Sequence, residues 1–151
     1  MSMVDATTVK RRLLWHGIPI FIFGLLAGAA MPVVINPRMA VAAHVGGVLS
    51  GMFLVLVGLI WDQIRLPATA AKVAFWLFLY ASYTGWLAQF LAAVFGTSRA
   101  TPIGGAGFWG SPWQENLVLY LAISFSIAIL AACVLALWGL SNRRAADCRT
   151  N

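Results

Sequence analysis

The sequence predicts an all-α integral membrane protein, a single four-helix bundle formed by residues 1–151. Hydrophobic residues make up 62% of the chain and charged residues only 9%. A soluble domain is typically about 45–50% apolar and about 25% charged. The apolar residues also gather into four runs, each long enough for the 20 or so helical residues that cross the hydrocarbon core of a bilayer. So few charges would leave a soluble fold with most of its apolar surface uncovered.

The four runs are expected to be helical, because backbone groups in lipid must pair within their own segment. The expected helices cover residues 13–34, 39–61, 70–95 and 116–140. Asn36-Pro37 separates the first two runs, and proline suits the first turn of a helix. The first run also resembles a signal peptide, because Lys10-Arg11-Arg12 precedes it. It is long for such a segment, so we expect a retained helix.

The link at residues 96–115 is the one long loop in the sequence. It is rich in glycine, with aromatic residues interspersed at Phe108, Trp109 and Trp113. Loops of this length in small proteins are often functional. A flexible connector lying in the membrane interface explains the same composition equally well.

Basic residues predict the orientation in the membrane. Most of the ten Lys and Arg residues lie in the two tails and in the link between the second and third runs, and only Arg38 and Arg99 lie on the other side. The positive-inside rule therefore predicts cytoplasmic N- and C-termini in an inner membrane of bacterial type. This topology also explains the net charge of +6 without a nucleic-acid partner. Tryptophans near the ends of the runs are expected to be interfacial anchors: Trp15, Trp61, Trp113 and Trp138.

Several kinds of chemistry have no support in the sequence. No aspartate or glutamate lies within a predicted span, which argues against a proton-relay pump or a cation transporter. HExxH, CxxCH and the nucleotide-binding glycine motif are absent. Cys133 and Cys148 are about 22 Å apart along a helix, too far for a disulfide.

The sharpest functional signal is His44, in the second run. Gly47, Gly51 and Gly58 follow it at offsets of 3, 7 and 14 residues, which places all four on one helical face. One interpretation is close helix packing, with His44 hydrogen-bonding across a ladder of small residues. The other is a haem or metal ligand, with the glycines leaving room for a flat macrocycle. His16 is expected near the opposite membrane face, so a haem held by both histidines is not predicted.

Polar residues in the third run lie at a depth similar to that of His44. Ser82, Gly85 and Gln89 share one helical face. A glutamine at this depth is unfavourable in lipid, so it should face the bundle, a cavity or a neighbouring subunit. Asn116 opens the fourth run near the same level. A purely structural hydrogen bond between helices is the alternative role for each of these residues.

Several segments resemble hydroxylaminobenzene mutases, over most of the chain. The first is Asn36-Pro37-Arg38-Met39 with His44, Gly47 and Gly51. The others are Phe95-Gly96-Thr97-Ser98, Thr101-Pro102-Ile103 and Pro112-Trp113-Gln114-Glu115. The resemblance implies an isomerase that converts an aryl hydroxylamine to an aminophenol.

A more distant resemblance is to bacterial styrene-oxide isomerases, through His16-Gly17 and Ala43-His44 with Gly51. Those isomerases are trimers that bind haem b through the histidine matching His44. The asparagine preceding the glycine that matches Gly51 is Ser50 in this chain, and their helix 3 asparagine and tyrosine fall at Gly85 and Gln89. These differences concern the substrate and leave the haem ligand in place.

Together the two resemblances imply a haem b enzyme in which the iron held by His44 acts as a Lewis acid. We expect Gln89 and Ser50 to orient the substrate. Tyr83 is expected to act with them by packing against the aromatic ring of the substrate. Further residues are expected to pack against substrate or cofactor: Gly47, Gly51, Gly85, Trp86 and Asn116. A thin bundle has little interior, so a second subunit of a homo-oligomer is expected to wall the site. The resemblance implies that this homo-oligomer is a trimer.

Three other functions remain open from the sequence. An epoxide isomerase would use the same Lewis-acid chemistry. A haem-bearing electron carrier or subunit would usually have a second axial ligand. A small transporter or scaffold would need no cofactor.

Overall fold

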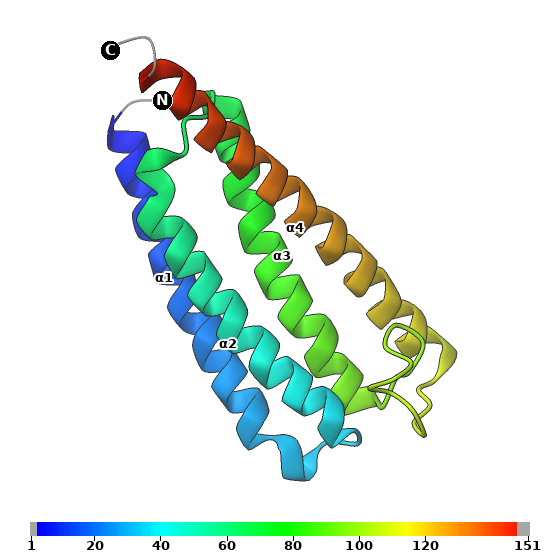
Figure 1. Cartoon of the computed structure of the whole chain (residues 1–151). Coiled ribbons are helices and arrows are strands. Elements are labelled where there is room, and N and C mark those ends of the chain that lie inside the picture. The colour runs from blue at the N-terminus through cyan, green and yellow to red at the C-terminus, as the bar shows by residue number, and fades with distance from the viewer. Residues whose placement is uncertain (1–2, 148–151) are drawn as a thin grey trace.

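The computed structural model describes the backbone of residues 3–147 and the side chains of residues 7–142. Within that range the chain is all helical, which confirms the predicted fold class (Figure 1). The helices are α1 (Met3–Ala29), α2 (Pro37–Ile60), α3 (Ala68–Phe95) and α4 (Pro112–Asp147), with short 3-10 turns η1 (Met31–Val33) and η2 (Trp61–Gln63). Cys148 and Arg149 lie outside the described residues.

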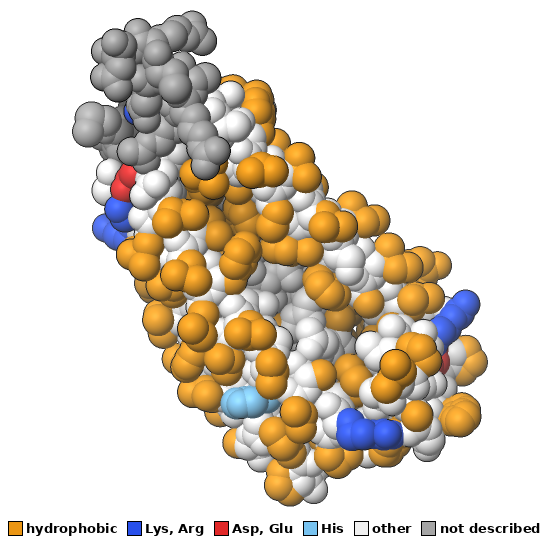
Figure 2. All heavy atoms as spheres, viewed as in Figure 1, with side chains coloured by type: hydrophobic (Ala, Val, Ile, Leu, Met, Phe, Trp, Pro, Cys, Tyr) orange, Lys and Arg blue, Asp and Glu red, His pale blue; other side chains and the backbone are white. Residues whose placement is uncertain are grey.

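The four helices run alternately up and down, so the start of α1 and the end of α4 lie at the same end of the bundle (Figure 1). Each helix has a stretch long and apolar enough to cross a membrane. On the face drawn in Figure 2, hydrophobic side chains cover the flank and the Lys and Arg side chains lie towards the two ends. The chain is therefore a multi-pass membrane protein.

The turn between α1 and α2 is built around Asn36, which is fully buried. Its side-chain oxygen accepts hydrogen bonds from the backbone N–H groups of Arg38 at 3.1 Å and Met39 at 3.3 Å, which caps α2. Its side-chain nitrogen donates to the carbonyl oxygen of Gly104, 3.0 Å away. Asn36 therefore ties the start of α2 to the long loop.

Glycines allow α1 and α2 to pack closely. A Cβ on Gly47 would lie 2.6 Å from Cα of Gly24, and one on Gly51 would lie 2.6 Å from the backbone nitrogen of Phe21. The packing interpretation of the glycine stripe is therefore realised in this chain. The space that was expected beside Gly47 and Gly51 for a macrocycle is filled by α1.

The apolar core lies between α1, α2 and α3 in the half of the bundle that carries the termini. Leu13, Leu54 and Phe78 are fully buried there. Trp61 is only 1% exposed and packs in the same cluster, so its prediction as an interfacial anchor was wrong. Trp15 and Trp113 are 67% and 60% exposed, as an anchor requires.

The loop between α3 and α4 folds against the end of the bundle opposite the termini (Figure 1). Gly96 ends α3 with a φ of 65°, a left-handed conformation that favours glycine. The Glu115 carboxylate accepts hydrogen bonds from the backbone N–H groups of Ser98, Arg99 and Gly110 at 2.9–3.2 Å. These contacts hold the loop in one arrangement and do not describe a flexible connector.

Candidate functional site

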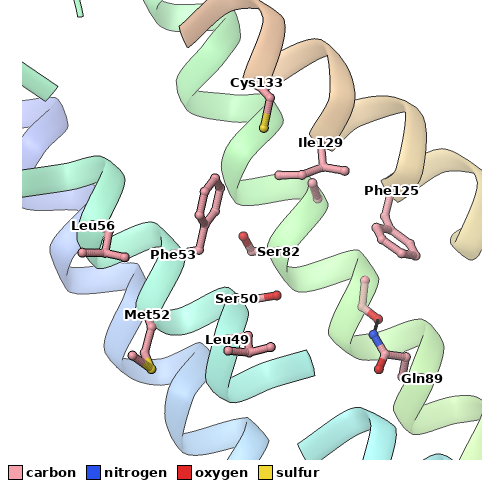
Figure 3. Close-up of a pocket in the computed structure, with 12 residues that line it drawn as sticks. Leu49, Ser50, Met52, Phe53, Leu56, Ser82, Gln89, Phe125, Ile129 and Cys133 are labelled. Atoms are coloured by element: carbon pink, nitrogen blue, oxygen red, sulfur yellow. Dashed lines mark hydrogen bonds between the residues drawn. The ribbon is translucent and has the colours of Figure 1, made fainter. Parts of the chain in front are cut away.

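An apolar groove runs between α2 and α4. Among the described residues α4 packs on α3 and η2, whereas no Cα atom of α4 lies within 8 Å of one in α2, so α3 forms the floor between them. The inner part of the groove is a cavity of about 540 Å³ (Figure 3). Its lining includes Ser50 and Phe53 from α2, Ser82 and Gln89 from α3, and Phe125 from α4. Three polar side chains in an apolar wall are typical of a small-molecule pocket.

A second cavity of about 440 Å³ continues towards the loop between α3 and α4. It is lined by the same three helices together with Ala100, Thr101 and Gly104 of the loop. Gln89 and Phe125 line both cavities and therefore mark the boundary between them. The loop that the sequence left open as functional or connecting thus forms part of a cavity wall.

Gln89 presents its amide to the groove. Its side-chain nitrogen donates to the backbone carbonyl of Gly85, 3.3 Å away, within α3. Its side-chain oxygen would lie 2.7 Å from a Cβ on Gly46, so the amide rests directly against the backbone of α2. Only glycine leaves room for the amide here.

The structure adds three residues to the predicted set. Ser82 and Phe125 line the inner cavity, and Gly46 makes room for Gln89. The shared helical face of Ser82, Gly85 and Gln89 was a usable signal for Ser82. Nothing in a single sequence indicates which residue of α4 faces α3.

His44 is held by α1. Its Nδ1 lies 2.9 Å from the carbonyl oxygen of Gly24. A carbonyl only accepts, so Nδ1 carries the proton and the lone pair is on Nε2. A Cβ on Gly28 would lie 2.7 Å from Nδ1, so this glycine makes room for the ring. An imidazole with one nitrogen fixed by a backbone carbonyl and the other bearing a lone pair fits an axial ligand of haem iron.

His44 and Gln89 contact opposite sides of α2. His44 faces Gly24 of α1, whereas Gly46, two residues further on, faces Gln89 of α3. Two residues of an α-helix are about 200° apart around the axis. One copy of the chain therefore does not bring the imidazole and the amide to the same cavity.

Three other predicted residues lie outside both cavities. The Tyr83 hydroxyl lies 3.0 Å from His16 Nδ1. Trp86 is stacked between two phenylalanine rings, with centroids 5.0 and 5.3 Å away. Asn116 accepts a hydrogen bond of 2.7 Å from the Arg99 guanidinium. Their contacts are with other side chains of the protein, and their expected contact with substrate gains no support from this geometry.

No group of three or more His, Cys, Asp or Glu side chains within the described residues is arranged to hold a metal ion. A single histidine suffices for haem, because the macrocycle itself supplies the in-plane ligands of the iron. His44 is thus the residue suited to hold a haem. The haem would have to lie on the side of the bundle formed by α1 and α2, where His44 is located.

Comparison with known proteins defines the family. The sequence profile of the styrene oxide isomerase family matches residues 9–141. Hydroxylaminobenzene mutase HabB of Ectopseudomonas oleovorans is 44% identical over 144 residues, covering 95% of this chain and 86% of that protein. Hydroxylaminobenzene mutase HabA of the same organism is 36% identical over 125 residues, covering 82% of this chain and 93% of that protein. No solved structure gives a significant match.

A four-helix membrane bundle with an intramembrane cavity and these relatives defines a membrane enzyme of the isomerase class. The chain belongs to the styrene oxide isomerase family. Both resemblances noted in the sequence are thereby confirmed.

Proposed function

We propose that this protein rearranges an aryl hydroxylamine, with hydroxylaminobenzene as the type substrate, to an aminophenol. The observation that carries the proposal is an apolar cavity that presents a single amide, Gln89. Two relatives aligned across the helices that form this cavity are named hydroxylaminobenzene mutases. The inner cavity, about 540 Å³, falls within the usual size of small-molecule pockets.

The reaction is an isomerisation without net redox change. The N–O bond breaks, a C–O bond forms at a ring carbon, that carbon loses its proton, and the nitrogen gains one. The Gln89 amide keeps one N–H and its carbonyl oxygen available, since only one contact, to Gly85, uses its nitrogen. A donor and an acceptor side by side suit an N–H–O–H group. Phe53 and Phe125 supply apolar walls for the ring, and such walls limit capture of a ring cation by water.

His44 is the residue that would hold the iron of haem b in this proposal. The carbonyl of Gly24 fixes the tautomer, which leaves the lone pair on Nε2 as the ligand atom. When bound, the haem iron would supply Lewis acidity towards the hydroxylamine oxygen. Gly24 and Gly28 together set the orientation of the imidazole on the flank of α1 and α2.

A site that uses both His44 and Gln89 needs two copies of the chain, because the two residues lie on opposite sides of α2. The His44 flank of one copy would meet the groove of the next. Such a head-to-tail contact closes into a ring when the rotation permits, and a trimer is the ring we propose.

Mixing of two inactive variants tests this arrangement. His44→Ala and Gln89→Leu are expected to be inactive when expressed alone. Expressed together, they should form mixed rings with one intact interface each, restoring roughly a quarter of wild-type activity if subunits mix at random. Activity no higher than that of the single variants, in rings shown by cross-linking to be mixed, would place both residues in one copy and contradict the proposal.

An epoxide isomerase is the second candidate, since the matched family takes its name from styrene oxide. Parallel turnover assays with hydroxylaminobenzene and styrene oxide separate the two functions. Conversion of styrene oxide alone would favour the epoxide isomerase. A pigmented protein that converts neither compound but cycles between redox states would favour an electron carrier.

We also propose that the protein lies in a bacterial inner membrane with both termini in the cytoplasm, as the distribution of basic residues predicts. A reporter active only in the cytoplasm should work when fused after residue 151 and fail when inserted in the loop near Gly107. The reverse result would invert the topology.

A further inference from the structure

A third cavity lies away from the groove, at the end of the bundle that carries the termini. It is formed by the first turns of α1 and α3 and has a volume of about 630 Å³. Arg12 from α1 and Lys72 from α3 both line it, together with the Thr69 side chain. None of these residues takes part in the proposed reaction.

The two cations in this cavity have no carboxylate partner among the described residues. The one ion pair found there joins Lys10 to Asp62, with 2.5 Å between nitrogen and oxygen, and leaves Arg12 and Lys72 out. The start of α3 adds to the positive potential, because its N-cap is Pro67, whose side chain makes no capping hydrogen bond. An anion is therefore the complementary ligand.

The position of the cavity indicates where that anion comes from. Arg12 and Lys72 are charged residues near the starts of the candidate spans in α1 (Thr7–Ala29) and α3 (Ala68–Phe95), where the chain is expected to meet the lipid headgroups. The apolar side of the cavity includes Phe75, which is 4% exposed, and Trp76, which is 62% exposed. A charged end beside an exposed aromatic edge matches a phosphate attached to acyl chains better than a free ion.

We propose that this cavity binds the phosphate of an acidic phospholipid headgroup, with Arg12 and Lys72 as its ion-pairing residues. The guanidinium and ammonium groups bind the phosphate oxygens, and Trp76 packs against the lipid stem. This site is independent of the proposed reaction and does not require haem.

Native mass spectrometry of the full-length protein in detergent, titrated with phosphatidylglycerol or phosphatidylcholine, tests the proposal. Phosphatidylglycerol should bind in preference to phosphatidylcholine. Arg12→Gln and Lys72→Gln should each weaken its binding about fivefold, and Lys72→Arg should retain it. Arg65→Gln is the matched control, because Arg65 is exposed at the same end but does not line the cavity.

Three results would overturn the proposal. An equal loss of binding in Arg65→Gln would show a general charge effect. Unchanged binding in both Arg12→Gln and Lys72→Gln would show that the cavity is not the site. Displacement of the lipid by inorganic phosphate at equal concentration would assign the cavity to a soluble anion.

Discussion

The imidazole Nδ1 of His44 lies 2.9 Å from the carbonyl oxygen of Gly24, so α1 fixes the ring that α2 carries. This contact leaves the lone pair on Nε2, and it lies on the side of α2 opposite to the one that meets Gln89. His44, which carries the proposed ligand atom, and the proposed substrate cavity at Gln89 thus lie on opposite sides of α2.

Gly28→Ala should disturb the proposed ligand without touching the groove. A Cβ at this position would lie 2.7 Å from His44 Nδ1, so the ring must move or lose its contact with Gly24. The purified variant should contain less haem per protein, or show a shifted absorption band. Gly58→Ala is the control, because its Cβ would meet only leucine side chains, at 3.2 Å. Wild-type haem content and spectrum in Gly28→Ala would contradict the role assigned to His44.

Gly46→Ala should disturb the groove without affecting the proposed haem ligand. Its Cβ would lie 2.7 Å from the Gln89 side-chain oxygen and push the amide out of position. A displacement of about 1 Å at a substrate-orienting group can cost about 100-fold in rate, so kcat should fall while haem content stays unchanged. Val45→Ala, at an exposed neighbouring position, should keep wild-type kcat. Full activity in Gly46→Ala would remove Gln89 from the proposed site.

Gly47→Ala should destabilise the fold itself. Its Cβ would lie 2.6 Å from Cα of Gly24 and 2.7 Å from the Trp86 ring, and the backbone of α1 cannot move aside locally. Overpacking of this kind costs about 1–3 kcal/mol, which should lower the thermal unfolding midpoint in detergent. Gly58→Ala should lower it less. Equal midpoints for Gly47→Ala and wild type would show that α1 and α2 are not in close backbone contact.

Glu115→Gln should loosen the loop between α3 and α4. The carboxylate accepts N–H groups from Ser98, Arg99 and Gly110, and hydrogen bonds to a charged acceptor are the stronger kind. Amide hydrogen exchange at these three positions should become faster in the variant. Asn116→Ala removes only the contact with the Arg99 side chain and should change the exchange less. Unchanged protection in Glu115→Gln would mean that other contacts hold the loop.

The four spans could be predicted because the hydropathy of a segment depends only on the residues that it contains. The helix ends were less exact: the first helix was expected to run to Val34, and α1 ends at Ala29. Pro32 lies in the 3-10 turn η1, where a proline cannot supply the N–H that would continue an α-helix. Pro37 begins α2 two residues before the expected start, because Asn36 supplies the cap.

Rotation of each helix about its axis was much harder to predict. In a soluble protein, polar residues mark the outer face, but here both lipid and core are apolar. Trp61 therefore looked like an anchor and is buried, and Tyr83 looked like a substrate contact and lies against His16. Gln89 was expected to face the bundle, a cavity or a neighbouring subunit, because a buried amide in lipid has few acceptable surroundings, and it lines both cavities of the groove.

We propose that His44 holds the group on which the isomerisation of aryl hydroxylamines depends. The direct measurement is the absorption spectrum of the purified protein together with its turnover of hydroxylaminobenzene. We predict a Soret band and aminophenol formation in the wild type and in His16→Ala, and loss of both in His44→Ala. Mutase activity in pigment-free protein, or a Soret band and activity that survive in His44→Ala, would contradict the account.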